Sequence, residues 1–200
     1  NTYVITSVNK GDDELCQFLK KKKIKYYRGH PLDVMKRIHD YAVKIKARNI
    51  VSITADNPFI DTSIIKKMMK IHETYKSDFT YTKGVPLGLY GYCLNTNILK
   101  EIIKTKKRTK TEFWGGYILK NVVYKKKMIK FKIFNSISKF RFTIDYKEDL
   151  IFCRKVLSEV KKKFINSRRI TAKKLEKINL KKYASINMNK RQIEGPKRYL

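Results

Sequence analysis

The sequence predicts an α/β fold in which helices cover both faces of a mostly parallel sheet. The first observation is alternation: through residue 76, short apolar runs typical of buried strands alternate with stretches whose apolar residues recur at helical spacing. Strands and helices in that order build βαβ units, whose strands lie parallel. The second observation is composition, because 200 residues with 42% hydrophobic and 12% aromatic side chains suffice to bury one core.

The expected elements follow one another with short polar connections. Strands are expected at 2–8, 24–27, 50–55, 78–82, 90–94 and 140–144. Helices are expected from Asp12 or Asp13 to Lys22, and at 32–46, 63–76, 96–104, 111–121 and 147–162. The segment 122–134 predicts one or two further strands in a hairpin arm, and 168–200 predicts one or two helices and a polar tail. We therefore divide the chain into a main domain, 1–165, and a C-terminal helical extension with a tail, 166–200.

An acidic residue, Asp56, follows the strand expected at 50–55. Pro58 ends that strand because proline has no N–H for the ladder, and Asp61 with Thr62 can cap the next helix. Ligands of open α/β sheets bind at the carboxyl ends of the strands, so Asp56 is a candidate to bind a metal or a substrate. An Asp before Asn-Pro is also a common turn former, and the residues alone leave both interpretations open.

Asp145 repeats this arrangement in the last third of the chain. The apolar run Phe-Arg-Phe-Thr-Ile at 140–144 ends at Asp145, and a helix is expected immediately after it. One interpretation is local: Asp145 is the helix N-cap, and Glu148 completes a capping box. The other is that Asp56 and Asp145, from distant parts of one sheet, converge on a divalent cation, since magnesium prefers carboxylate oxygens.

The chain is strongly basic: 48 Lys and Arg residues stand against 17 Asp and Glu, a formal net charge of +31. Such a balance raises nucleic acid or an anionic membrane as a partner. The lysines, however, occur on every expected helix rather than on one face, and an AT-rich genome also produces chains rich in Lys, Ile, Asn and Tyr. We expect no specific nucleic-acid partner, and no apolar run reaches the roughly 20 residues of a membrane span.

The cysteines and histidines argue against two further classes of site. The cysteines lie far apart and without CxxC spacing: Cys16, Cys93 and Cys153. They predict neither a disulfide framework nor a zinc site, and a reducing cytoplasm fits them. The histidines are scattered as well: His30, His39 and His72. They suggest no nucleophilic triad, and we expect His72 on the surface of a helix.

The segments that contain the two acids resemble one family. Residues 52–61 read SITADNPFID, and residues 141–150 read RFTIDYKEDL. They are similar to the T-A-D-x-P and T-[IV]-D-x-x-E-D-L segments of the cytidylyltransferases that make CMP-activated sugars. The branch they resemble is named for spore-coat polysaccharide synthesis and is related to the Kdo and sialic acid cytidylyltransferases. Three further segments, 26–38, 85–102 and 110–118, follow in the family's order, so the resemblance spans nearly the whole chain.

The resemblance implies a three-layer, Rossmann-like nucleotidyltransferase fold and a CTP-dependent reaction. A hydroxyl of an acidic sugar or related acceptor would attack the α-phosphate of CTP and release pyrophosphate, for synthesis of a surface polysaccharide. In the related enzymes the matching acids hold the metal, so Asp56 and Asp145 are the expected catalytic ligands of Mg²⁺, with Asp149 in support. Family members commonly form homodimers, here through the arm at 122–134. Two alternatives stay open: a basic nucleic-acid-binding domain, and an inactive relative that serves as a partner domain.

The resemblance also indicates residues on the nucleotide side. Arg28 stands in an Arg-Gly turn that matches the family and could present a cation to a phosphate. Alternatively, Arg28 only pairs with Asp33. Ser52 and Thr54 are the other nucleotide-binding candidates.

Candidates for acceptor binding come from two segments. Pro86 and Gly88 match the loop that covers the sugar, and Glu112 and Tyr117 keep their places in a later segment. Phe113 stands where the wider branch often has His. This departure falls in the acceptor-binding half, so it leaves the identity of the sugar open more than the nucleotide chemistry.

The family's first strand and phosphate-binding loop have no counterpart in this sequence, which starts at the family's second strand. That loop holds the triphosphate with backbone N–H groups and cations. Either the sequence is a fragment of a longer chain, or the protein is a degenerate relative. We favour the fragment because removing a central strand would leave an unpaired sheet edge, and we expect the polypeptide as written to bind CTP poorly.

Overall fold

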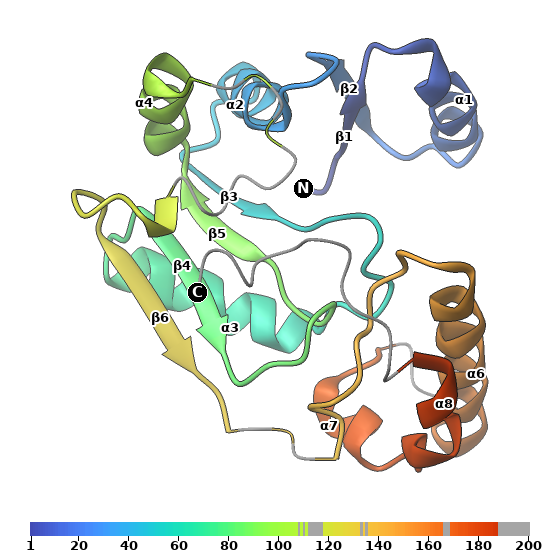
Figure 1. Cartoon of the computed structure of the whole chain (residues 1–200). Coiled ribbons are helices and arrows are strands. Elements are labelled where there is room, and N and C mark those ends of the chain that lie inside the picture. Colours follow the sequence, from blue (N-terminus) through green and yellow to red (C-terminus); the bar gives the residue numbers. More distant parts are fainter. Residues whose placement is uncertain are drawn as a thin grey trace. The chain divides into compact units, whose positions relative to one another are not determined.

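In a computed structural model, the chain forms two compact units that both combine strands with helices (Figure 1). The structure describes residues 1–107, 109, 111, 118–132, 134, 136–165 and 169–187. Among the described residues, the first unit comprises Asn1–Ile50 and Asn95–Tyr124, and the second comprises Val51–Leu94 and those from Lys125 to Asn187. The mixture of elements confirms the predicted α/β class.

The first unit is built on two parallel strands. Its elements are β1 (Val4–Ser7), the 3-10 helix η1 (Lys10–Asp12), α1 (Asp13–Lys21), β2 (Tyr26–Gly29), α2 (Val34–Lys44) and α4 (Thr96–Thr105). β1 pairs with β2 in parallel, and α2 contacts both strands and α4. The rings of Tyr27 and Tyr41 stack with centroids 4.8 Å apart, which fastens α2 to β2.

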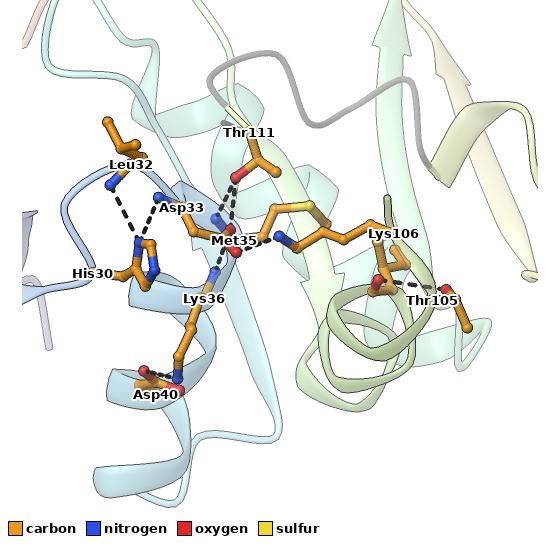
Figure 2. Close-up of polar contacts among 10 residues, drawn as sticks. His30, Leu32, Asp33, Met35, Lys36, Asp40, Thr105, Lys106 and Thr111 are labelled. Carbon is orange, nitrogen blue, oxygen red and sulfur yellow. Dashed lines mark hydrogen bonds and ion pairs between the residues drawn. The ribbon is translucent and has the colours of Figure 1, made fainter. Parts of the chain in front are cut away.

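A buried carboxylate joins three segments of the first unit (Figure 2). Asp33 is the N-cap of α2, and its Oδ1 accepts hydrogen bonds from the backbone N–H of Lys36 at 3.1 Å and from the hydroxyl of Thr111 at 2.8 Å. Its Oδ2 pairs with the ammonium of Lys106, which follows α4, and both side chains are only 4% exposed. Burial by itself would raise the pKa of Asp33, but Lys106 and the hydrogen bonds together lower it. This Asp33 clamp ties the start of α2 to the segment after α4.

The second unit is built on a four-stranded sheet. Its strands lie in the order β3, β5, β4, β6, with β4 antiparallel to β5 and parallel to β6. The elements are β3 (Asn49–Ser52), α3 (Thr62–Thr74), β4 (Phe79–Lys83), β5 (Tyr92–Asn95), β6 (Lys126–Lys130), α6 (Lys147–Lys163), α7 (Ala172–Glu176), η2 (Leu180–Tyr183) and α8 (Ala184–Asn187). β3 begins and β5 ends at the border between the units. α3 packs on β4, and α6 contacts α8 (Figure 1).

The core of the second unit joins the sheet to its helices. Fully buried members of one apolar cluster include Met68, Phe142, Phe152 and Leu175. Asp61 caps α3, as predicted, because its Oδ1 accepts the backbone N–H of Ser63 at 2.9 Å. Its Oδ2 accepts the N–H of Ala172 at 2.8 Å, so the same carboxylate ties α7 to α3.

The prediction of a strand at 140–144 is wrong. This segment is largely buried, but the backbone N–H of Phe142 donates to the carbonyl of Leu87 and the N–H of Ile144 to the carbonyl of Asp56, each at 2.9 Å. A strand requires a continuous ladder with one neighbouring strand, and these bonds go to two separate loops. β3 is also shorter than the predicted 50–55, since it ends at Ser52.

The hairpin arm predicted at 122–134 is not found in the described residues of that segment. They contain one strand, β6, which pairs in parallel with β4 rather than antiparallel with a neighbour in sequence. Charged and polar side chains are as typical of an edge strand as of a hairpin arm, and β6 lies at the edge of the four-stranded sheet. The arm therefore gives no support to dimerisation.

His72 is buried, at 2% exposure, and its prediction as a surface residue of a helix is wrong. It lies on the side of α3 that packs on β4, where its Nδ1 is 2.9 Å from the hydroxyl of Thr80. Burial lowers the pKa of His72, so the neutral imidazole is the favoured form in this core.

Some expectations fall partly outside what the structure describes. Most of the helix expected at 111–121 lies there, and the division into 1–165 and 166–200 stays a prediction. The short helices α7, η2 and α8 agree with helical structure in the last part of the chain. Over the described ranges, no helix combines the length and the apolar character that a membrane crossing requires.

Candidate active site

Asp56 lies in a turn after β3. Within the turn, the side-chain amide of Asn57 donates to the hydroxyl of Thr54 at 2.7 Å, and its backbone N–H donates to the carbonyl of Thr54 at 3.2 Å. The carboxylate of Asp56 instead turns to a distant segment, where its Oδ2 accepts the hydroxyl of Thr143 at 3.1 Å. The turn interpretation is thus right for the backbone, but Thr54 and Asn57 close the turn without the side chain of Asp56.

The segment before α6 brings Asp145 to this turn. The N–H of Ile144 donates to the carbonyl of Asp56, and Asp145 is the next residue. Asp56 is near enough that its charge acts on the pKa of Asp145. The structure therefore brings the two predicted acids together within the second unit.

A buried arginine and a buried aspartate hold Asp145. Arg141, 6% exposed, pairs with Oδ2 of Asp145 and, at 2.7 Å, with Oδ2 of Asp149. Asp149, itself 0% exposed, also accepts the backbone N–H of Asp145 at 3.0 Å and of Tyr146 at 2.9 Å. The N-cap of α6 is Tyr146, and Asp149 closes the capping box. The local interpretation that gave these roles to Asp145 and Glu148 is therefore wrong.

Among the described residues, the carboxylates of Asp56, Asp145 and Asp149 and the guanidinium of Arg141 determine the local charge. Burial raises the pKa of Asp145; Arg141 lowers it, and the negative charges of Asp56 and Asp149 raise it, with a net increase. The side chain of Asp145 is nevertheless 27% exposed, so a ligand from solvent can reach it. Because the carboxylates repel one another, binding of an additional cation between them is favourable.

Asp56 and Asp145 fit a divalent cation. Oδ1 of Asp56 is buried and accepts no hydrogen bond from any described residue. A buried carboxylate oxygen in that state is unfavourable unless a donor or a cation joins it. Magnesium commonly takes one or two protein carboxylates and leaves its other positions to water and substrate phosphates. In the described part of the chain no group of three or more His, Cys, Asp and Glu side chains could hold a metal, so these acids form a pair rather than a full ligand set.

The candidates Ser52 and Thr54 precede Asp56 closely along the chain. Ser52 is half-buried at the end of β3, and Thr54 is exposed in the turn. Their role toward a nucleotide stays a prediction, and their position beside Asp56 is compatible with it.

Arg28 lies in the first unit, at the end of β2, and is engaged by its neighbours. It pairs with Asp13 at 2.7 Å, and its Nε donates to the carbonyl of Ser7 at 3.0 Å. The alternative that Arg28 pairs with Asp33 is wrong, because Asp33 pairs with Lys106. Whether Arg28 binds a nucleotide stays a prediction.

Of the acceptor-binding candidates, Pro86 and Gly88 are buried, and Glu112 and Tyr117 lie outside the described residues. Gly88 has a φ of +89°, and a Cβ there would lie 2.3 Å from the carbonyl carbon of Phe142. Glycine is therefore required for the loop to approach the segment that carries Asp145.

A cavity of about 430 Å³ opens beside Pro86. Its lining includes Lys83, Val85, Lys130 and Phe131. Its volume falls within the roughly 300–1,000 Å³ typical of small-molecule sites. The loop predicted to cover the acceptor thus borders a space of suitable size.

Sequence reasoning missed the contacts of Arg141 and Thr143. Both stand at every second position before Asp145, and in an extended chain every second side chain points to the same side. The apolar Phe140, Phe142 and Ile144 occupy the intervening positions. Alternation within RFTID was therefore the signal that could have placed Arg141 and Thr143 next to Asp145.

Comparisons with known proteins identify the family and the fold of this chain. The family model described as Cytidylyltransferase matches residues 4–190. The spore coat polysaccharide biosynthesis protein SpsF of Bacillus subtilis (strain 168) is 30% identical over 152 residues, which are 74% of this chain and 63% of SpsF. The uncharacterized protein MJ1063 of Methanocaldococcus jannaschii is 26% identical over 119 residues, 59% of this chain and 49% of that protein. The chain thus spans less than two thirds of the length of these curated relatives.

Among solved structures, a cytidylyltransferase from Leptospira borgpetersenii serovar Hardjo-bovis (strain JB197) is similar to this chain with a TM-score of 0.77. The two share 21% identity, and the match covers 97% of this chain and 81% of the other. This likeness shows the fold and supports the predicted Rossmann-like architecture.

Proposed function

Because the chain belongs to the cytidylyltransferase family, we propose that its protein transfers a CMP group from CTP to an acidic sugar or sugar-like acceptor and releases pyrophosphate. The name of the relative SpsF supports a place in polysaccharide biosynthesis. The observation that carries the proposal is the meeting of Asp56 and Asp145, with one buried oxygen of Asp56 that accepts no hydrogen bond from the described residues.

In the proposed reaction, a hydroxyl oxygen of the acceptor forms a bond to the α-phosphorus of CTP. The bond from that phosphorus to the bridging oxygen of pyrophosphate breaks, its electron pair leaves with pyrophosphate, and the hydroxyl proton passes to solvent. When bound, Mg²⁺ would polarise the phosphoryl oxygens and offset their charge. Asp56 and Asp145 would hold it, and Thr143 fixes the orientation of the Asp56 carboxylate.

The remaining predicted residues take supporting roles in this proposal. Ser52, Thr54 and Arg28 would contact the nucleotide. Pro86, Gly88, Glu112 and Tyr117 would contact the acceptor, and the cavity that Pro86 lines supports such a position for Pro86.

Assembly and location are further parts of the proposal. A homodimer is proposed from the family resemblance. A cytoplasmic location agrees with three buried free thiols at Cys16, Cys93 and Cys153. Specific nucleic-acid binding and an inactive partner domain are not favoured by the family match.

The test is pyrophosphate release by the full-length gene product with Mg²⁺, each of the four nucleoside triphosphates and a panel of acidic sugars. We expect release with CTP and one acceptor, and none with that acceptor omitted. A folded protein that releases no pyrophosphate with any pair would contradict the proposal.

A further inference from the structure

We propose that Arg141 is a positioning residue that occupies Asp145 in the nucleotide-free protein, so that a divalent cation joins the site with CTP rather than alone. This inference rests on the proposed function and concerns the order of binding. Its basis is the set of contacts made by Arg141, a residue to which the sequence analysis assigned no role.

The guanidinium of Arg141 is held in place from several sides. It donates a hydrogen bond of 2.7 Å to Oδ2 of Asp149. The backbone N–H groups of Asp145 and Tyr146 donate to the same oxygen and hold Asp149 in place. The ring of Tyr146 lies 5.5 Å from the guanidinium carbon. The side chain of Arg141 is 7% exposed and that of Asp149 is 0% exposed, whereas that of Asp145 is 27% exposed. Asp145 is therefore the acid of this ion-pair network that solvent reaches, whereas Arg141 and Asp149 are buried and hold each other in place.

The positive charge of Arg141 affects how a divalent cation can bind to Asp145. Arg141 already provides a positive charge to Asp145, and a guanidinium and a divalent cation that share one carboxylate repel each other. A metal ion by itself would have to displace Arg141 from Asp145 or bind beside it. The negatively charged triphosphate removes this conflict, because it offsets the guanidinium and supplies the remaining oxygen ligands. Asp56 and Asp145 should thus bind the cation weakly without nucleotide and tightly with it.

The first experiment measures Mn²⁺ affinity by isothermal titration calorimetry on the unmodified full-length protein, with and without a non-hydrolysable CTP analogue. The calorimetric signal of Mn²⁺ binding to the analogue alone is subtracted. We expect Mn²⁺ to bind at least about tenfold more tightly in the presence of the analogue, a difference of about 1.4 kcal/mol. Equal affinities would overturn the inference.

The second experiment uses the double variant Arg141→Gln/Asp149→Asn. The paired amides preserve size and leave the net charge unchanged, and the Asn side-chain carbonyl can still accept the N–H groups that fix α6. This variant releases Asp145, so nucleotide-free Mn²⁺ affinity should rise about tenfold over the unmodified protein. Unchanged or weaker binding would show that Arg141 only orients Asp145. Arg141→Lys, which keeps the charge, should retain the weak nucleotide-free affinity, and Lys36→Met is a matched control at an exposed pair.

Two single variants separate this inference from the proposed function. Asp56→Asn and Asp145→Asn should each weaken Mn²⁺ binding in the presence of the analogue. If neither does, the two acids are not the metal site and the proposed function loses its main support. If both do but the double variant binds no more tightly than the unmodified protein, the role of Arg141 alone is wrong.

Discussion

Each unit of the molecule contains a buried aspartate paired with a buried cation, and the two arrangements use their oxygens differently. In the first unit, both oxygens of Asp33 are engaged: Oδ1 by Lys36 and Thr111, and Oδ2 by Lys106 (Figure 2). One negative charge meets one positive charge, and every contact comes from the same unit. Such a carboxylate stabilises the fold and leaves nothing for a ligand.

In the second unit the balance is different. Among the described residues, Asp145 and Asp149 both pair with the guanidinium of Arg141, and Oδ1 of Asp56 accepts no hydrogen bond. In the described part of the chain two carboxylates thus share one guanidinium, and the side chain of Asp145 remains partly exposed. Burial and an ion pair therefore do not by themselves mark a catalytic acid. The number of engaged oxygens and the local charge balance distinguish the structural acid from the candidate catalytic ones.

The largest expected effect is on turnover at the unbalanced site. Asp56→Asn and Asp145→Asn each remove a proposed cation ligand at nearly constant size, so CTP-dependent pyrophosphate release should fall about 10²–10³-fold. The free energy of unfolding should change by no more than about 1 kcal/mol. Asp40→Asn, which breaks an exposed pair with Lys36, is the control and should retain full turnover. Full activity in either site variant would remove the catalytic assignment.

The Asp33 clamp should respond in the opposite way, through stability. Lys106→Met leaves Asp33 buried without its cation, so the free energy of unfolding in urea should fall by about 3–5 kcal/mol. Lys36→Met breaks the exposed pair with Asp40, whose side chains are 44% and 31% exposed, and should cost less than about 1 kcal/mol. Similar losses for the two variants would mean that the clamp is no more than a surface ion pair.

Gly88 links stability to the position of Asp145. Gly88→Ala puts a Cβ 2.3 Å from the backbone of Phe142 at a φ of +89°, so stability should fall by about 2–4 kcal/mol. Displacement of the segment that carries Asp145 should also reduce turnover. Gly11→Ala is the matched control, since a Cβ there meets no atom within 4 Å. Equal melting temperatures for the two variants would show that the loop adjusts freely.

His72 gives the smallest expected effect, and it depends on pH. Its folded pKa lies below the ordinary value near 6.5 because the ring is buried, so below that pH the unfolded chain binds a proton that the folded protein does not. Stability present above about pH 6.5 should therefore decline as the pH falls toward the folded pKa, by at most about 1.4 kcal/mol per pH unit. Urea unfolding at several pH values should show this slope in His39→Gln and lose it in His72→Gln. A slope that persists in His72→Gln would assign it to another group.

Local sequence patterns predicted much of the fold and the location of the site. The alternation of apolar runs and amphipathic stretches located β1 to α3, and Asp61 was correctly predicted as the cap of α3. The two acids of the candidate site were identified from the ends of apolar runs and from family resemblance. Both cues are local, because they depend on residues adjacent in sequence.

The errors concern contacts between distant segments. Phe140–Ile144 has the composition of a strand, yet its partners are the carbonyls of Leu87 and Asp56, which no local pattern indicates. His72 was wrongly predicted to be exposed. Its burial results from the packing of α3 on β4, which the sequence of the helix alone does not indicate. The partner of Asp33, Lys106, is 73 residues away along the chain. Pairing of this kind requires the fold to be known first.

The most direct test of the contrast between the two buried acids is a crystal structure of the full-length protein with Mn²⁺ and a non-hydrolysable CTP analogue. Anomalous scattering locates the metal independently of any catalytic assay. We predict a peak between Asp56 and Asp145 that also contacts the triphosphate, and no peak at Asp33. A metal bound elsewhere, with both oxygens of Asp56 engaged only by the protein, would contradict this account.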